Sequence, residues 1–201
     1  MSKQNLKIML FHGLMAREHM QRHWLHYLAE LGYPDVQLLG HLQSAEQIAK
    51  QICLNQTQNQ KLVLLGYSQG GFQAVKVAQA LEHVRHPVDL LLTIAAGGKG
   101  RLLPKQWRYN PRQIPENVRK SLNFFSLSDT LGSDRCYQDN FIQASHHDQL
   151  IENIIFDQSA QVGHIELSRC YPKQRIHHLV KQHLIFRIEH ELLKLEQCAS
   201  V

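Results

Sequence analysis

One serine in this sequence stands in a pattern that is typical of a nucleophile. Ser68 is the centre of G-x-S-x-G, formed by Gly66-Tyr67-Ser68-Gln69-Gly70. The pattern comes between the apolar run Leu62–Leu65, which predicts a strand, and the predicted helix Phe72–Val84. A sharp turn from strand to helix strains the central residue and lifts its hydroxyl clear of the sheet. We therefore predict that Ser68 is a nucleophile; the alternative is a small residue at a tight turn.

A serine hydroxyl is a weak nucleophile, so it needs a general base, and the base needs a group that orients it. Of the fourteen histidines, His164 follows the last predicted strand, in a loop where Gly163 permits a sharp approach. Asp129 ends the fifth predicted strand and is the candidate for the orienting acid. Asp134 lies five residues further on and remains the alternative acid if its loop folds back.

Acyl transfer to a serine also requires two N–H groups that stabilise the negative charge on the attacked carbonyl oxygen. One is expected from the backbone of Gln69, because this residue directly follows the nucleophile. The other is expected from the backbone of Leu14, in the loop Phe11-His12-Gly13-Leu14 after the first predicted strand. His12 is interpreted as a residue that shapes this loop, since it comes too early in the chain to be the base.

The elements that must position these residues alternate between strands and helices along the whole chain. Strands are expected at Leu6–Phe11, Val36–Leu39, Leu62–Leu65, Val88–Ala95, Leu122–Leu127 and Asn153–Phe156. Helices are expected between Met20 and Leu31, after the capping box of Ser44 and Gln47, over Phe72–Val84, and from near Lys173 to about Glu196. This alternation predicts one α/β domain over residues 1–201, with a mostly parallel six-stranded sheet and helices on both faces. Ligands of such sheets bind beyond the carboxyl ends of the strands.

Composition and charge fit an ordinary globular domain, because 43% of the 201 residues are hydrophobic and 19% are charged. The net charge is +5, but the Lys and Arg residues are scattered and no stacking or helix-turn-helix motif accompanies them. We therefore expect no nucleic-acid partner. The apolar run Ile8–Phe11 is too short for a signal peptide or a transmembrane segment, and the four cysteines form no C-x-x-C pair. These features predict a cytoplasmic protein with free thiols.

With these residues in place, the sequence resembles the small, lidless bacterial lipases of the α/β-hydrolase superfamily over most of its length. The motifs that carry the resemblance are the turn His12–Gly13, the elbow at Ser68, Thr93–Gly98, the strand that ends at Asp129, and Val162–Leu167. The wording of the elbow, G-Y-S-Q-G, is also similar to cutinases and carboxylesterases. The order Ser68, Asp129, His164 is that of the superfamily. The resemblance implies hydrolysis of a small carboxylic ester through an acyl-serine intermediate, without metal or organic cofactor.

Two other functions remain open at this point. A thioesterase or another acyl hydrolase would use the same residues, and a non-catalytic ligand-binding protein can share the fold. The sequence does not specify the acyl chain, the alcohol or the oligomeric state.

Two segments lie between these motifs, and the second is longer than in the compact lipases. Residues 97–120 are interpreted as an irregular loop that borders the site, in which Trp107 and Leu102–Leu103 are candidates for contact with an acyl chain. Residues 130–152 are interpreted as an insertion, and they include His146-His147-Asp148. A metal site there is set aside because adjacent histidines are expected to point apart and nothing else has metal-ligand spacing.

Overall fold

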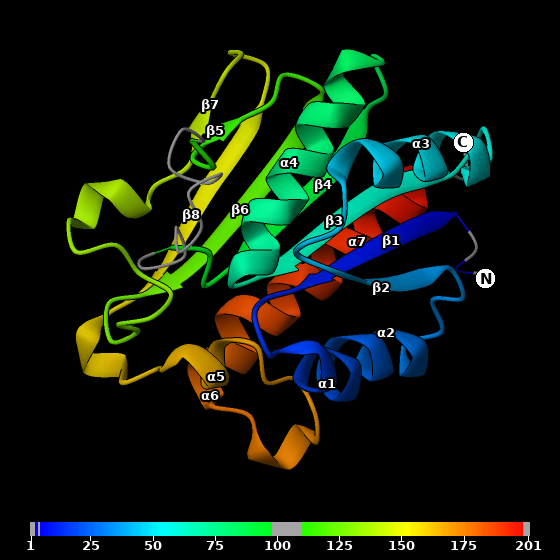
Figure 1. Cartoon of the computed structure of the whole chain (residues 1–201). Helices are drawn as coiled ribbons and strands as arrows, with labels where there is room; N and C mark the ends of the chain where they lie inside the picture. The colour runs from blue at the N-terminus through cyan, green and yellow to red at the C-terminus, as the bar shows by residue number, and fades with distance from the viewer. Residues whose placement is uncertain (1–2, 4, 98–109, 199–201) are drawn as a thin grey trace.

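A computed structural model describes residues 3, 5–97 and 110–198 of the chain. Six strands form one sheet in which every neighbouring pair is parallel, in the order β2-β1-β3-β4-β6-β8 (Figure 1). The strands are β1 (Leu6–His12), β2 (Val36–Gly40), β3 (Lys61–Tyr67), β4 (Val88–Ile94), β6 (Val118–Ser126) and β8 (Leu150–Phe156). The predicted fold class is therefore confirmed.

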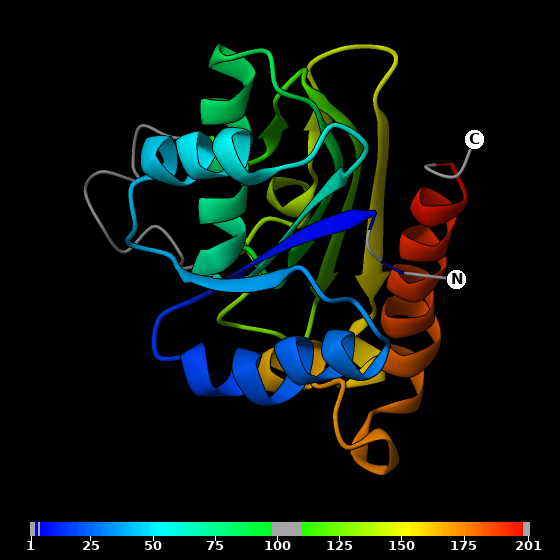
Figure 2. The same ribbon diagram turned by 90° about the vertical axis from the view of Figure 1, so that its right-hand side faces the viewer.

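Helices cover both faces of the sheet, as predicted. One face packs against α3 (Ala45–Asn55) and α4 (Gln69–His83). The opposite face packs against the N-terminal and C-terminal helical segments of the chain. Figure 2 shows α3 and α4 on one side of the sheet and α7 on the other. The elements of the two terminal segments are α1 (Arg17–Met20), η1 (Gln21–Leu25), α2 (His26–Glu30), α6 (His178–Val180), η7 (Lys181–Ile185) and α7 (Phe186–Cys198).

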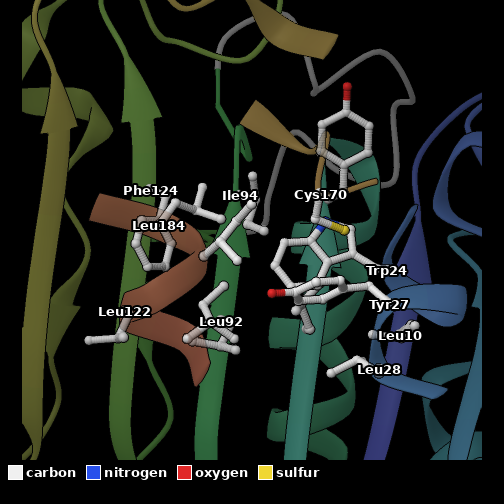
Figure 3. Packing of buried hydrophobic residues seen from close by; sticks show 14 of the residues in the cluster. Leu10, Trp24, Tyr27, Leu28, Leu92, Ile94, Leu122, Phe124, Cys170 and Leu184 are labelled. Carbon is white, nitrogen blue, oxygen red and sulfur yellow. The ribbon is translucent and has the colours of Figure 1, made fainter. Parts of the chain in front are cut away.

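Alternating residues of each strand enter different halves of the core. In β1, Leu6, Ile8 and Leu10 belong to the cluster under the terminal helices, whereas Met9 and Phe11 belong to the cluster under α3 and α4. This is the two-residue period of a strand whose faces are both buried. Figure 3 shows the first cluster, where the Trp24 and Tyr27 rings lie beside Cys170.

Charged residues anchor the C-terminal helix to the far side of the sheet. The Lys120 ammonium lies 2.9 Å from the Glu191 carboxylate and 3.3 Å from that of Glu152. The Arg187 guanidinium lies 2.6 Å from Glu152 and 3.0 Å from Glu191. Because Glu191 is 4% exposed, its charge is compensated by two cations rather than by water.

Several element boundaries differ from the predicted ones. The last helix begins at His178 rather than near Lys173, because residues Lys173–Arg175 form a separate 3₁₀ turn and Ile176 is extended. The strand β6 begins at Val118 and β8 at Leu150, earlier than predicted. The first residues of both strands include charged side chains, Arg119 and Lys120 in β6 and Glu152 in β8, which interrupt the apolar pattern.

The segment 97–120 is only partly irregular. Its residues 98–109, with Trp107 and Leu102–Leu103, lie outside the described residues. A short strand, β5 (Gln113–Ile114), pairs in parallel with β7 (Gln143–Ala144) inside the segment 130–152. This pairing was not predicted, since two-residue strands leave no periodic signal.

The strand order places the ends of β1 and β3 side by side. β2 lies on one side of β1, and β3 lies on the other. The connection after β1 therefore runs toward one edge of the sheet, and the connection after β3 runs toward the opposite edge. A crevice at the carboxyl ends of the strands is expected at such a switch point. The loop after β1 and the G-x-S-x-G turn after β3 meet there.

None of the helices in the described part of the chain is both long enough and apolar enough to cross a lipid bilayer. The four cysteines are free thiols, as predicted.

Replacing Leu92 by alanine tests the core. Leu92 lies in β4 and is fully buried, whereas Leu54 in α3 is 72% exposed. We expect Leu92→Ala to lower the free energy of unfolding by about 2–5 kcal/mol, and Leu54→Ala to change it by about 0.5 kcal/mol or less. Urea denaturation of both variants measures the difference, and equal losses would contradict the assignment of the core.

Candidate active site

Ser68 occupies a strained turn between β3 and α4. Its backbone angles are φ 56° and ψ −126°, in the positive-φ region that residues with a side chain rarely adopt. Two backbone hydrogen bonds fix the turn, one from the amide of Ser68 and one to its carbonyl oxygen. The Ser68 amide donates to the Ile94 carbonyl at 2.9 Å, and the Gly71 amide donates to the Ser68 carbonyl at 2.9 Å. This is the strand–turn–helix setting in which a serine hydroxyl is presented at the end of a sheet.

The turn is possible because Gly70 has no side chain. A Cβ on Gly70 would lie 1.9 Å from the Phe11 carbonyl oxygen, far inside van der Waals contact. The first turn of α4 therefore packs directly on the backbone of β1.

Asp129 and His164 form a hydrogen-bonded pair at the same edge of the sheet. Asp129 follows β6, and His164 begins the one-turn helix α5 (His164–Leu167) after β8. The His164 Nδ1 lies 2.7 Å from the Asp129 Oδ2, and the Asp129 side chain is 1% exposed. The other carboxylate oxygen accepts the amides of Leu131 at 2.9 Å and Gly132 at 2.8 Å. Both oxygens of this buried carboxylate are thus bonded.

The carboxylate beside His164 belongs to Asp129, whereas Asp134 faces another partner. Asp134 Oδ2 accepts a hydrogen bond from the Arg112 guanidinium at 2.8 Å. Gly132, which the sequence analysis did not single out, allows the Asp129–His164 contact. A Cβ at this position would lie 2.2 Å from Asp129 Oδ2 and 2.7 Å from His164 Nδ1.

The loop after β1 lies against the nucleophile turn. A Cβ on Gly13 would be 2.9 Å from the Ser68 Cβ and 3.0 Å from the Gln69 backbone nitrogen. The backbone that leads to Leu14 therefore runs beside Ser68 and the start of α4. The two amides expected to bind the oxyanion, those of Leu14 and Gln69, belong to these two neighbouring segments. The His12 Nδ1 atom lies 2.8 Å from the Gly13 carbonyl oxygen, and this contact stabilises the loop.

Three residues that were not predicted to belong to the site support the backbone around His164. Tyr67 donates a hydrogen bond from its hydroxyl to the His164 carbonyl at 3.1 Å. Ser168 donates to the Ile165 carbonyl at 3.2 Å, and His19 Nε2 lies 2.7 Å from the Ser168 oxygen. Tyr67 is an unspecified position of G-x-S-x-G, and His19 is 149 residues from Ser168 in the sequence. No local pattern connects them.

The His146-His147-Asp148 turn differs from the expectation that adjacent histidines point apart. The two imidazole centroids lie 4.1 Å apart, and the donor atoms of the three side chains lie within 4.8 Å of one another. The turn precedes β8 and therefore lies at the amino end of that strand, opposite the edge that carries Ser68 and His164. All three residues are exposed, and we assign them no part in the site.

The chain is similar in structure to several solved proteins. It matches the RedJ thioesterase from the prodiginine pathway of Streptomyces coelicolor with a TM-score of 0.56 and 12% identity, covering 94% of this chain and 91% of that one. Human thioesterase 2 matches with a TM-score of 0.54 and 12% identity, over 98% of each chain. A lidless α/β serine hydrolase from Xanthomonas campestris matches with a TM-score of 0.52 and 15% identity, over 89% and 80%. Neither a family model nor a curated protein sequence matches this chain.

These matches and the six-stranded parallel sheet define the fold of the protein as that of the α/β-hydrolases. The fold expected from the sequence resemblance is confirmed.

The half-buried His19, which contacts Ser168 near His164, makes stability depend on pH. Burial, reinforced by His23, lowers the pKa of His19 from 6.5 to about 4. The unfolded chain therefore takes up a proton at this position at a higher pH than the folded chain does, and stability falls as pH decreases from about 6.5 toward 4. We expect the wild type to lose more free energy of unfolding than His19→Gln between pH 7 and pH 5. Urea denaturation at both values measures this, and equal losses in the two proteins would refute it.

Proposed function

We propose that this protein is a serine hydrolase that cleaves carboxylic esters through an acyl-serine intermediate. Ser68 is the nucleophile, His164 the general base and Asp129 the group that orients it. The observation that carries the proposal is the buried Asp129–His164 hydrogen bond of 2.7 Å at the sheet edge where the Ser68 turn lies. A strained serine without a base would be only a tight turn.

The pairing with Asp129 determines which nitrogen of His164 acts. The Nδ1–H donates to the carboxylate, so Nε2 carries the lone pair in the neutral ring. Nε2 accepts the Ser68 proton as the hydroxyl oxygen attacks the ester carbonyl carbon. Asp129 then stabilises the imidazolium that forms.

The tetrahedral intermediate carries its negative charge on the former carbonyl oxygen. We assign the backbone amides of Gln69 and Leu14 as donors to this oxygen, because they belong to the start of α4 and the adjoining loop. The intermediate collapses as His164 gives its proton to the leaving alcohol, and the acyl group stays on Ser68. Water, deprotonated by His164, then attacks the acyl carbon and releases the acid and the free serine.

Exposed apolar side chains next to the site support a substrate with an apolar acyl chain. Leu14 is 58% exposed and Met15 is 95% exposed, and both follow Gly13, which lies against Ser68. Leu131, whose amide bonds to Asp129, is 59% exposed, and Ile165, beside His164, is 52% exposed. Exposed apolar side chains on the segments that carry the polar groups of a site are typical of a ligand-binding surface.

Thioester hydrolysis is the second candidate reaction, because two of the structural neighbours are thioesterases. The acyl-serine step is the same, and only the leaving group differs. Rates on an ester and a thioester that share one acyl chain decide between them. Tight ligand binding without turnover or probe labelling would instead indicate a non-catalytic binding protein.

The nucleophile is tested with a labelled fluorophosphonate, which reacts with activated serines. We expect the wild type to become labelled and to hydrolyse short p-nitrophenyl esters, and Ser68→Ala to lose both properties. The exposed Ser159 in the 3₁₀ turn Gln158–Ala160 offers a control, and Ser159→Ala should label like the wild type. Full labelling of Ser68→Ala would rule out Ser68 as the nucleophile.

The acid is tested by a matched pair of substitutions. Asp129→Asn removes the charge beside His164 and lets the histidine adopt the wrong tautomer, so we expect kcat to fall by about 10³-fold or more. Asp134→Asn changes the same functional group where it faces Arg112, and should leave kcat within about threefold of the wild type. Steady-state kinetics on one ester measures both. If Asp134→Asn is the inactive variant, the assignment must be exchanged.

A further inference from the structure

His164 sits on an element too short to hold its imidazole in place by itself. The helix α5 has four residues, and it follows Gly163, which has no side chain to pack. Asp129 fixes Nδ1 but leaves the ring free to tilt about that one contact. A general base must be held close to its proton donor, because small displacements in such a site cost large factors in rate. Other contacts must therefore fix the backbone and the face of the ring.

Tyr67 makes both kinds of contact with His164. Its hydroxyl donates a hydrogen bond to the His164 carbonyl oxygen at 3.1 Å. Its ring lies against the imidazole, with centroids 5.0 Å apart and planes tilted by 35°. Tyr67 is 3% exposed, and burial raises its pKa to about 12. The hydroxyl therefore keeps its proton near neutral pH and remains a donor.

A second layer of hydrogen bonds supports the same turn of backbone. The fully buried Ser168 donates to the Ile165 carbonyl at 3.2 Å. The Ser168 oxygen also lies 2.7 Å from His19 Nε2, so this turn is tied to α1. The His19 ring lies 5.9 Å from that of Tyr67. The carbonyls of both His164 and Ile165 are thus tied to the body of the protein.

We propose that Tyr67 is a positioning residue that sets the distance between the nucleophile and the general base. Tyr67 is covalently joined to Ser68 at the end of β3, and it contacts His164 through its hydroxyl and its ring. One residue therefore links the two reacting groups, which lie on elements far apart in the sequence. Asp129 supplies the charge that favours the imidazolium, and Tyr67 supplies the placement. This inference rests on the proposed function.

Two substitutions separate the hydroxyl from the ring. Tyr67→Phe keeps the ring against His164 and removes the hydrogen bond, so we expect kcat to fall about 10-fold with KM within about twofold. Tyr67→Leu removes both contacts, and we expect kcat to fall about 100-fold. Tyr27→Phe is the matched control, because Tyr27 is equally buried and donates its hydroxyl to Glu189 on α7. It should lose stability without a change in kcat or KM.

The imidazole is observed independently of turnover by NMR of protein labelled with ¹⁵N-histidine. The proton on the His164 Nδ1 gives a downfield resonance that is assigned by its loss in His164→Gln. We expect this resonance to shift or broaden in Tyr67→Phe and to stay unchanged in Tyr27→Phe. An unchanged resonance in Tyr67→Phe overturns the inference, whether or not the protein turns over an ester.

The kinetic outcomes distinguish this inference from the proposed function. If the wild type neither labels nor hydrolyses esters, the proposed function fails, and the NMR comparison alone decides whether Tyr67 positions His164. If the wild type is active and Tyr67→Phe retains its kcat, the positioning role is refuted while the proposed function stands. A rise in KM at unchanged kcat would also refute it, because it would indicate a substrate contact.

Discussion

Ser68 is held at φ 56° and ψ −126°, a conformation that costs about 1–3 kcal/mol for a residue with a side chain. Such strain persists only where the surroundings leave no alternative. Here the first turn of α4 packs so closely on β1 that a Cβ on Gly70 would meet the Phe11 carbonyl oxygen at 1.9 Å. The position of β1 therefore determines the path of the turn, and the loop after β1 is brought beside Ser68 by the same contact.

The parallel sheet extends this constraint to the rest of the site. All six strands end at one edge, so Asp129 after β6 and His164 after β8 emerge on the same side as Ser68. The two faces of the sheet are buried under helices, and the strands have little freedom to shift. The Asp129 carboxylate is removed from water, and its two oxygens accept the Leu131 and Gly132 amides and the His164 ring. A buried charge without these partners would be unstable.

The structural similarity to solved proteins establishes the fold, whereas the proposed reaction is inferred from the geometry of the site. Structural matches at 12% and 15% identity establish an α/β-hydrolase fold. They do not select a reaction, since one fold serves many chemistries. The hydrolytic function is inferred from the Ser68 turn, the Asp129–His164 pair and the neighbouring loop. The proposal of an apolar acyl chain rests on exposed apolar residues such as Met15 and Ile165.

The sequence by itself determined the features that depend on local chemistry. Apolar runs predicted the six strands, and the G-x-S-x-G pattern predicted a strained turn, because both signals lie within a few neighbouring residues. The first residues of β6 and β8, Val118 and Leu150, were not predicted to be in strands, because charged side chains interrupt the apolar run there. The start of the last helix was placed too early because Ile176 fits the helical spacing while its backbone is extended.

Only the tertiary structure decided which distant groups meet. Asp129 and Asp134 are both reasonable acids in the sequence, and the fold brings one to His164 and the other to Arg112. The contact of Tyr67 with His164 spans 97 residues. Contacts of this kind depend on how helices and strands pack, and packing is a property of the whole chain that no local pattern records.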